Sequence, residues 1–305
     1  MVASTAYLLV SHGSRDPRPQ VAMDHLSSLV SDRLINSIFS IDRSTLQARS
    51  RAIASSENVL LYAGEEKATR RNTVLLERSS SGVLPELQVG KCRDVRSLEK
   101  RVIVDTACLE FAPVELSEHI RQLGERLVAM GVRELKILPV FLMAGMHVKQ
   151  DLPEAIAAAK ASLDGAIELT VCSHLGSHPQ MGLLLSQRLE QVNTQQALLV
   201  AHGSRRPKGN RKIALLGRQM EMKVAYWAVP PDIESQVIDL IQGGCQQITI
   251  LPYFLFPGGI TDAIAHRTEE LAERFPKTSI RLLPPLGATD EIADIACDLL
   301  LSSEG

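Results

Sequence analysis

Short, nearly continuous apolar runs alternate along this chain with longer segments in which apolar residues recur at helical spacing. The runs have the pattern of strands buried on both faces. They are AYLLV from Ala6, ELKILPVFL from Glu134, QALLV from Gln196 and QITILPYFL from Gln247. Segments such as PVELSEHIRQLGERLVAMG, from Pro113, have helical periodicity and end at a glycine. Strands that alternate with helices predict an α/β fold built on parallel sheets.

Three phrases occur twice along the chain in the same order, which indicates an internal duplication. The pairs are YLLVSHGSRDPRP at Tyr7 with ALLVAHGSRRPKG at Ala197, GVRELKILPVFLMAG at Gly131 with GCQQITILPYFLFPG at Gly244, and SHLGSHPQM at Ser173 with PPLGATDEI at Pro284. Their offsets are 190, 113 and 111 residues. We therefore predict two similar lobes, residues 1–193 and 194–305, each with a parallel β-sheet flanked by helices.

The unequal offsets also locate an insertion in the first lobe. The first two phrases lie 77 residues further apart there than in the second lobe. Composition places the insertion at about 40–100, where Ser, Arg and Glu are abundant. A hairpin, a lid and a partly disordered segment all fit such a stretch, whose length argues against a bare loop.

Composition and charge argue against some classes of protein but do not identify the function. The 305 residues are 45% hydrophobic with a formal net charge of −2, so bulk electrostatics indicate neither a nucleic-acid partner nor a membrane surface. The five cysteines form no CxxC pair, which is typical of a protein from a reducing compartment. We find no secretory signal and no apolar run long enough to span a membrane. A cytoplasmic protein is expected.

Two histidines follow predicted strands of the first lobe. His12 comes directly after the first strand, and His147 lies past the ILPVFL strand, before a helix start indicated by Asp151 and Pro153. Because ligands collect at the carboxyl ends of parallel strands, both imidazoles are expected at one cavity. Neutral imidazole binds divalent iron, cobalt, nickel or zinc and also accepts protons. The alternative for a single histidine is a hydrogen bond to a backbone carbonyl.

The second lobe retains only one histidine of this pair. His202 matches His12, whereas the residue that matches His147 is Ile260, and His266 is expected on the surface or in packing. The repeated phrase thus predicts the same turn twice, with chemistry mainly in the first copy. Glu110, after the strand RVIVDTA, is the best candidate for a third residue beside His12 and His147, because a carboxylate can hydrogen-bond to an imidazole or hold a cation. Its alternative role is a solvated strand-end carboxylate.

Together these motifs resemble the sirohydrochlorin chelatase family in its two-lobed long form. The resemblance rests on LLVSHGSRDPRP, CLEFAP and LPVFLMAGMHVKQDLP, and on the degenerate copies LLVAHGSRRPKGN, AYWAVPP and LPYFLFPGGITDAI. It implies the chelatase fold and an ATP-independent lyase that inserts Fe(II) or Co(II) into sirohydrochlorin, towards sirohaem or cobalamin. Because nothing in the sequence marks an adaptation to cobalamin synthesis, we expect a small preference for iron. The resemblance also implies that His12 and His147 are the metal-binding and proton-handling pair. The metal is then a substrate, and no tightly bound cofactor is expected.

The resemblance further implies a substrate with eight carboxylates, for which a rim of cationic side chains is expected. The candidates are Arg15, Lys149, Arg205 and Arg206, each of which is alternatively a solvated surface charge. His174 and His178 fit either metal delivery or a polar loop. Since one chain supplies both lobes, a monomer is expected.

Of three rival functions, the sequence leaves one open. An α/β hydrolase needs a G-x-S-x-G nucleophile elbow, and a phosphotransferase needs a P-loop, neither of which occurs here. A non-catalytic carrier of metal or tetrapyrrole uses the same histidines as a chelatase. Only turnover distinguishes that carrier from the enzyme.

Overall fold

The computed structural model describes residues 5–54, 102–206 and 208–302. The chain forms two compact units, of which one comprises Met1–Arg33 with Val102–Gly305 and the other Leu34–Arg101. Helix α1 (Arg18–Ala54) extends from the first unit into the second, so the start of the predicted insertion is helical. The rest of that insertion, residues 55–101, lies outside the described residues.

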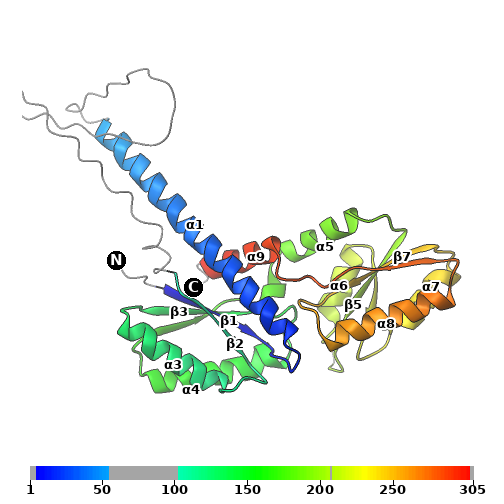
Figure 1. Cartoon of the computed structure of the whole chain (residues 1–305), viewed down its shortest axis with the longest axis horizontal. Helices are drawn as coiled ribbons and strands as arrows, with labels where there is room; N and C mark the ends of the chain where they lie inside the picture. Colours follow the sequence, from blue (N-terminus) through cyan, green and yellow to red (C-terminus); the bar gives the residue numbers. More distant parts are fainter. Residues whose placement is uncertain (1–4, 55–101, 207, 303–305) are drawn as a thin grey trace, which may run out of the picture. The chain divides into compact units, whose positions relative to one another are not determined.

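Four parallel strands form the N-terminal sheet, in the order β2-β1-β3-β4 (Figure 1). They are β1 (Thr5–Ser11), β2 (Val104–Cys108), β3 (Glu134–Pro139) and β4 (Glu168–Val171). Successive residues Leu8, Leu9 and Val10 of β1 are all fully buried, as expected for a strand covered on both faces. The continuous apolar run therefore predicted this environment correctly.

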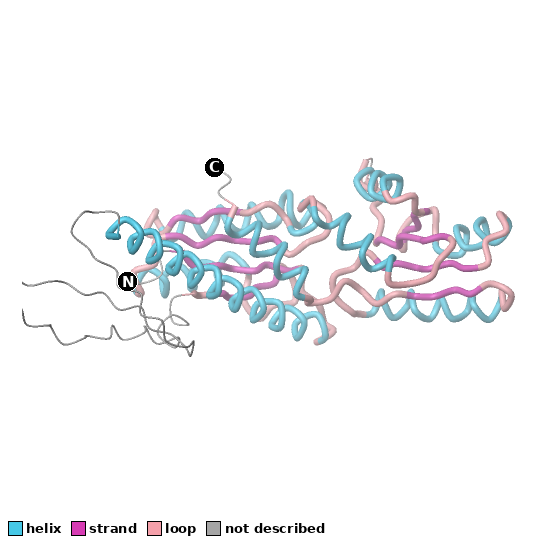
Figure 2. Tube along the Cα trace, turned by 90° about the horizontal axis from the view of Figure 1, so that it is seen from above, coloured by secondary structure: helices cyan, strands magenta, loops and turns pink. Residues whose placement is uncertain are grey.

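Helices cover the N-terminal sheet on both sides (Figure 2). Helices α3 (Leu116–Ala129) and α4 (Leu152–Leu163) share one core cluster with β1 and β3. On the other side lie α1 and, unexpectedly, the last helix of the chain, α9 (Asp290–Leu301). Arg33 of α1 forms ion pairs with Asp290 and Asp294 of α9. The C-terminal helix thus completes the cover of the N-terminal sheet.

The C-terminal sheet repeats the same strand order, β6-β5-β7-β8. Its strands are β5 (Gln196–Ala201), β6 (Lys223–Tyr226), β7 (Gln247–Pro252) and β8 (Ser279–Leu282). The accompanying helices are α5 (Gln180–Glu190), α6 (Arg211–Gln219), α7 (Ile233–Gln242) and α8 (Gly259–Arg274). Two like parallel sheets confirm the predicted α/β fold with an internal duplication, whereas the lobe boundary at residues 193 and 194 stays a prediction.

The register of the two sheets matches at the central strands. Val10 of β1 pairs with Pro139 of β3, and Val200 of β5 pairs with Pro252 of β7. The repeated phrases therefore occupy equivalent positions in space as well as in sequence. Among the described helices, none is both long enough and apolar enough to cross a membrane.

Candidate active site

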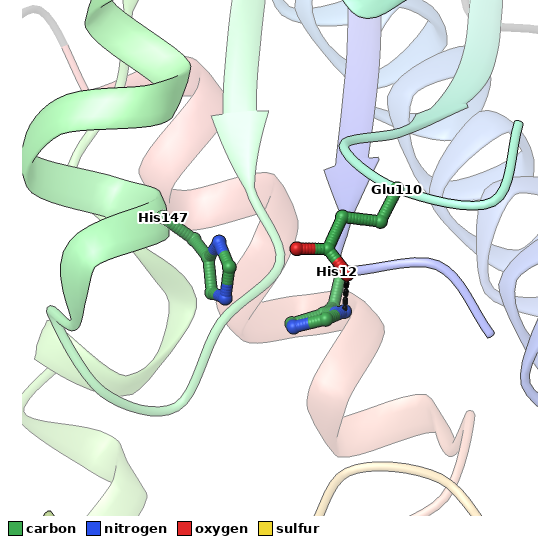
Figure 3. Close-up of side chains that lie close together, drawn as sticks. All are labelled: His12, Glu110 and His147. Carbon is green, nitrogen blue, oxygen red and sulfur yellow. Dashed lines mark ion pairs between the residues drawn. The ribbon is translucent and has the colours of Figure 1, made fainter.

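Three side chains converge at the carboxyl edge of the N-terminal sheet, each from a different strand end (Figure 3). His12 directly follows β1, Glu110 follows β2, and His147 begins the turn η1 (His147–Asp151) beyond β3. Because β1 lies between β2 and β3, the sheet order itself brings these three strand ends together. The sequence predicted all three residues, and the structure places them side by side.

The backbone fixes Glu110 next to His12. The amide of Leu109 donates to the carbonyl of Ser11 at 3.0 Å, and the amide of Glu110 donates to the carbonyl of His12 at 2.9 Å, so pairing continues beyond the strands. Gly13 makes this approach possible with a φ of +89°, since a Cβ there would lie 1.9 Å from the carbonyl oxygen of Glu110. The glycine of the HGS phrase is thus required by the site.

The three side chains are close enough to bind one metal ion together. The ring centroids of His12 and His147 are 4.3 Å apart at an interplanar angle of 77°, and His12 Nδ1 lies 4.0 Å from Glu110 Oε2. All three offer ligand atoms within 4.8 Å of one another. Ligand bonds of about 2.0–2.2 Å then require each side chain to move inward by less than about 1 Å. His12 and Glu110 are exposed, so the site is open to an incoming ion.

Each imidazole is oriented by a hydrogen bond on its Nδ1. His12 Nδ1 lies 3.2 Å from the carbonyl oxygen of Gly13, and His147 Nδ1 lies 2.8 Å from Asp151 Oδ2. Both partners are acceptors, so a neutral ring that makes this hydrogen bond carries its proton on Nδ1 and has its lone pair on Nε2. The ring of Phe141 stacks against His147 at a centroid distance of 6.4 Å. From the sequence, Asp151 indicated only the start of a helix. Its i, i+4 spacing from His147 was the signal that could have predicted this hydrogen bond.

The predicted cationic residues lie in two loops and one turn at the strand ends. The guanidinium of Arg15 lies 5.2 Å from the ring centroid of Phe111, an exposed side chain with a φ of +58°. Lys149 is exposed within η1, and Arg205 and Arg206 are exposed in the segment after β5. Among these four residues, Arg15 is the one whose side chain contacts an aromatic ring, that of Phe111, which follows Glu110 in the chain.

The remaining histidines lie outside the three-residue cluster. His174 is buried, and burial, together with the charges of Lys212 and Lys149, lowers its pKa to about 4. Among the described residues its Nε2 has no hydrogen-bond partner. His178 Nε2 lies 3.9 Å from Asp298 Oδ2, and His266 is exposed beside Glu270, as expected for a surface residue.

The equivalent edge of the C-terminal sheet has the same backbone and different side chains. His202 Nδ1 lies 3.0 Å from the carbonyl oxygen of Gly203, and the amide of Ala228 donates to the carbonyl of His202 at 2.8 Å. Ala228 therefore occupies the place of Glu110, and Ile260 corresponds to His147 in the sequence repeat. Within the described residues, a metal-ligand cluster is found only at the N-terminal sheet.

A protein-family model described as CbiX matches the chain twice, over residues 90–192 and 196–302. The two matches together cover more than half of the sequence; the first spans β2 to β4 and leaves out β1, and the second spans β5 to β8. The duplication is therefore a duplication of one family unit.

Named relatives and solved structures give the same result. A sirohydrochlorin cobaltochelatase of Priestia megaterium is 24% identical over 190 residues, which are 57% of this chain and 59% of that protein. A sirohydrochlorin ferrochelatase of the same organism is 25% identical over 219 residues, 66% of this chain and 81% of that protein. The structure of SirB from Bacillus subtilis with Fe3+ superposes with a TM-score of 0.63 at 16% identity and covers 99% of this chain and 98% of that one. At that identity the superposition shows the fold alone.

Proposed function

This chain belongs to the CbiX family, and from that premise we propose that the protein is a sirohydrochlorin metallochelatase. It inserts Fe(II) or Co(II) into sirohydrochlorin and releases two protons. The relatives named as cobaltochelatase and ferrochelatase support this substrate class, although the chain spans only 59% of the length of the first of them.

The observation that carries the proposal is the convergence of His12, Glu110 and His147 at one strand edge. Two neutral imidazoles and a carboxylate form a donor set suited to a divalent first-row ion. The set leaves further coordination positions for water and for the tetrapyrrole nitrogens, which a metal in transit requires. A closed four-ligand site would instead retain the ion.

The reaction follows from what these three groups can exchange. The incoming ion loses water as it binds the Nε2 atoms of the two histidines and the carboxylate of Glu110. The tetrapyrrole then replaces these ligands with its four nitrogens, while two of those nitrogens lose their protons. The imidazoles and the carboxylate that release the metal accept these protons and pass them to solvent, so charge balances at each exchange.

The cationic residues at the strand ends supply binding for an acidic tetrapyrrole. Arg15, Lys149, Arg205 and Arg206 offer charged donors for carboxylates around the ring. Exposed Phe111, beside Arg15, offers an apolar surface for the macrocycle. We assign recognition to these residues and the chemical step to His12, Glu110 and His147.

The alternative function is a carrier that binds metal or tetrapyrrole without turnover. The open coordination and the proton acceptors favour the enzyme, because a carrier has no need to remove pyrrole protons. We propose iron as the preferred metal by a small margin and a monomer as the working form, with both lobes supplied by one chain. A dimeric mass in light scattering would contradict the monomer.

The test is anaerobic metallation of sirohydrochlorin, followed by visible absorbance, with Fe(II) and Co(II) in parallel. Wild type is compared with His147→Ala and with His202→Ala, which removes the matching histidine of the other sheet. We expect wild type to accelerate insertion and His147→Ala to lose at least about a hundredfold in rate. No acceleration by wild type with either metal would favour the carrier.

A further inference from the structure

The hydrogen bond between His147 and Asp151 lies inside an unusual turn. Residues His147–Asp151 form a single π-helical turn, in which the amide of Leu152 donates to the carbonyl of His147 five residues earlier. Such turns are rare within α-helices and frequent at functional sites. Asp151 Oδ2 accepts from His147 Nδ1 at 2.8 Å across this turn.

Comparison of the two halves shows that the turn contains an extra residue. The strands before it match at an offset of 113, since Pro139 corresponds to Pro252 in the sheet register. After it, the buried helix positions match at an offset of 112. They are Leu152, Ile156 and Ala159 in α4, and Ile264, Thr268 and Leu271 in α8. The first half therefore has one more residue between strand and helix, and the π turn accommodates it.

The second half shows that this helix can start without a carboxylate at this position. The residue that corresponds to Asp151 is Ala263 at an offset of 112 and Ile264 at 113, and neither side chain accepts a hydrogen bond. In the first half, Asp151 stands at the N-cap position of α4, yet its side chain makes no capping hydrogen bond. A helix cap is therefore not what this carboxylate provides.

We propose that Asp151 is the positioning residue of His147. Its carboxylate holds the proton of the imidazole on Nδ1 and fixes the plane of the ring, so that the Nε2 lone pair is presented to the metal substrate. The i, i+4 spacing places the histidine and the carboxylate on one face at the entrance of α4, and the extra residue of the first half lies within this same turn. The role of the metal as substrate rests on the proposed function, whereas the tautomer and the binding of a metal do not.

The test compares three substitutions of Asp151 with a matched control. Asp151→Ala removes the acceptor, Asp151→Asn replaces it with an amide that can also donate, and Asp151→Glu retains the charge. Glu154→Gln is the control, because Glu154 is an exposed carboxylate in the first turn of α4 and loses the same charge. Each protein is titrated with Co(II) by absorbance, and the histidine tautomers of the metal-free protein are measured by 15N NMR.

We expect Asp151→Ala to bind Co(II) about 10–100-fold more weakly than wild type. Asp151→Asn should lose at least as much, because its amide can donate to Nδ1 and stabilise the wrong tautomer. Asp151→Glu should recover part of the loss, and Glu154→Gln should bind as wild type does. In the metal-free wild type, His147 should carry its proton on Nδ1, whereas Asp151→Ala should show a mixture of tautomers.

Two results would each overturn the proposal. One is Co(II) binding by Asp151→Ala within twofold of wild type, and the other is a wild-type His147 protonated on Nε2. The proposed function has a separate readout in the metallation rate of wild type. If wild type fails to metallate sirohydrochlorin, the function is wrong, and the tautomer of His147 still decides the role of Asp151.

Discussion

The strand ends of the two sheets differ in their side chains far more than in their backbones. Both have a histidine whose Nδ1 hydrogen-bonds to the carbonyl of the next glycine, and in both the strand pairing continues to the carbonyl of that histidine. Glu110 and His147 lie around His12. At His202, Ala228 occupies the place of Glu110, and Ile260 corresponds to His147 in the sequence repeat.

This difference separates two roles of one motif. The hydrogen bond between the histidine and the glycine carbonyl is present in both sheets. We therefore assign it to the structure of the turn and not to the proposed reaction. Among the described residues, only the N-terminal sheet brings three potential metal ligands together at that turn. The repeated phrase therefore predicts a turn of the same geometry in each sheet. Whether a turn also carries a candidate site depends on the residues at the ends of the adjacent strands.

The helices that follow β3 and β7 show the same contrast. Helix α8 begins regularly and buries Ile264 completely. Its counterpart begins with a π turn that holds His147 against Asp151. The half with the ligands thus departs from regular helix geometry, and the half without them does not.

Substitution of the two matched histidines, one at a time, should give the largest difference between the two sheets. We expect His12→Ala to lower the rate of sirohydrochlorin metallation by at least about a hundredfold, because it removes a metal ligand and a proton acceptor. His202→Ala, which deletes the same turn hydrogen bond, should stay within about threefold of wild type. Steady-state metallation by absorbance measures both. Equal losses would show that the second copy is also catalytic.

The two glycines of the repeated turn should also differ. Both have positive φ, but a Cβ on Gly13 would lie 1.9 Å from the backbone oxygen of Glu110, and one on Gly203 would lie 2.7 Å from the Cβ of Tyr226. We expect Gly13→Ala to lower the free energy of unfolding by about 2–4 kcal/mol and Gly203→Ala by about 1–2 kcal/mol. Urea unfolding measures both free energies. A larger loss for Gly203→Ala than for Gly13→Ala would contradict the geometry.

Acid should destabilise the protein through His174, whose place in the second half is taken by Pro285. Its pKa is lowered from 6.5 to about 4 by burial, so the unfolded chain takes up a proton that the native state does not. Stability is thus lost as pH falls from 6.5 towards 4. At pH 4.5 this contribution amounts to about 2 kcal/mol relative to pH 7.

The measurement is urea unfolding of wild type and His174→Gln at pH 7 and pH 4.5. We expect the free energy of unfolding of wild type to fall by about 2 kcal/mol more than that of the variant between these two values. The comparison cancels the carboxylates, which titrate in both proteins. An identical fall in the two proteins would rule out His174 as the source.

Three engineered ligands at the second sheet test whether the π turn matters for metal binding. This is the smallest effect that we expect. Ala228→Glu combined with Ile260→His recreates three ligands around His202. Because α8 has neither the extra residue nor a carboxylate for the new imidazole, we expect Co(II) to bind there at least about tenfold more weakly than at His12. Titration in the background of His12→Ala isolates the new site, and equal affinity would show that the π turn is unnecessary.

Local patterns predicted the strands and the site-bearing edge well. The continuous apolar runs were correct for β1 and β5 because a strand buried on both faces has no polar side to display. The HGS phrase marked the turn that only glycine permits at Gly13. His12, Glu110 and His147 could be named from sequence because each follows a strand of one parallel sheet, and such strands end at one edge.

Other features escaped the sequence because they depend on distant parts of the chain or on a single residue in a turn. Helix α9, which follows the second sheet in the chain, packs against the first sheet, and its own apolar face does not identify that partner. For His174 the sequence left metal delivery and a polar loop open, and it did not indicate that this side chain is buried. The pairing of Asp151 with His147 required the turn to be seen.

By itself the sequence determined the duplication, the alternation of strands and helices, and the three chemical groups placed after strands. These follow from periodicity and chain order, which are local properties. The tertiary structure alone decided which groups meet, which sheet α9 covers, and that the two copies of one turn have different surroundings. Those outcomes depend on strand order and register, which act between segments that the chain order leaves far apart, and on one additional residue before α4, which acts within a single turn.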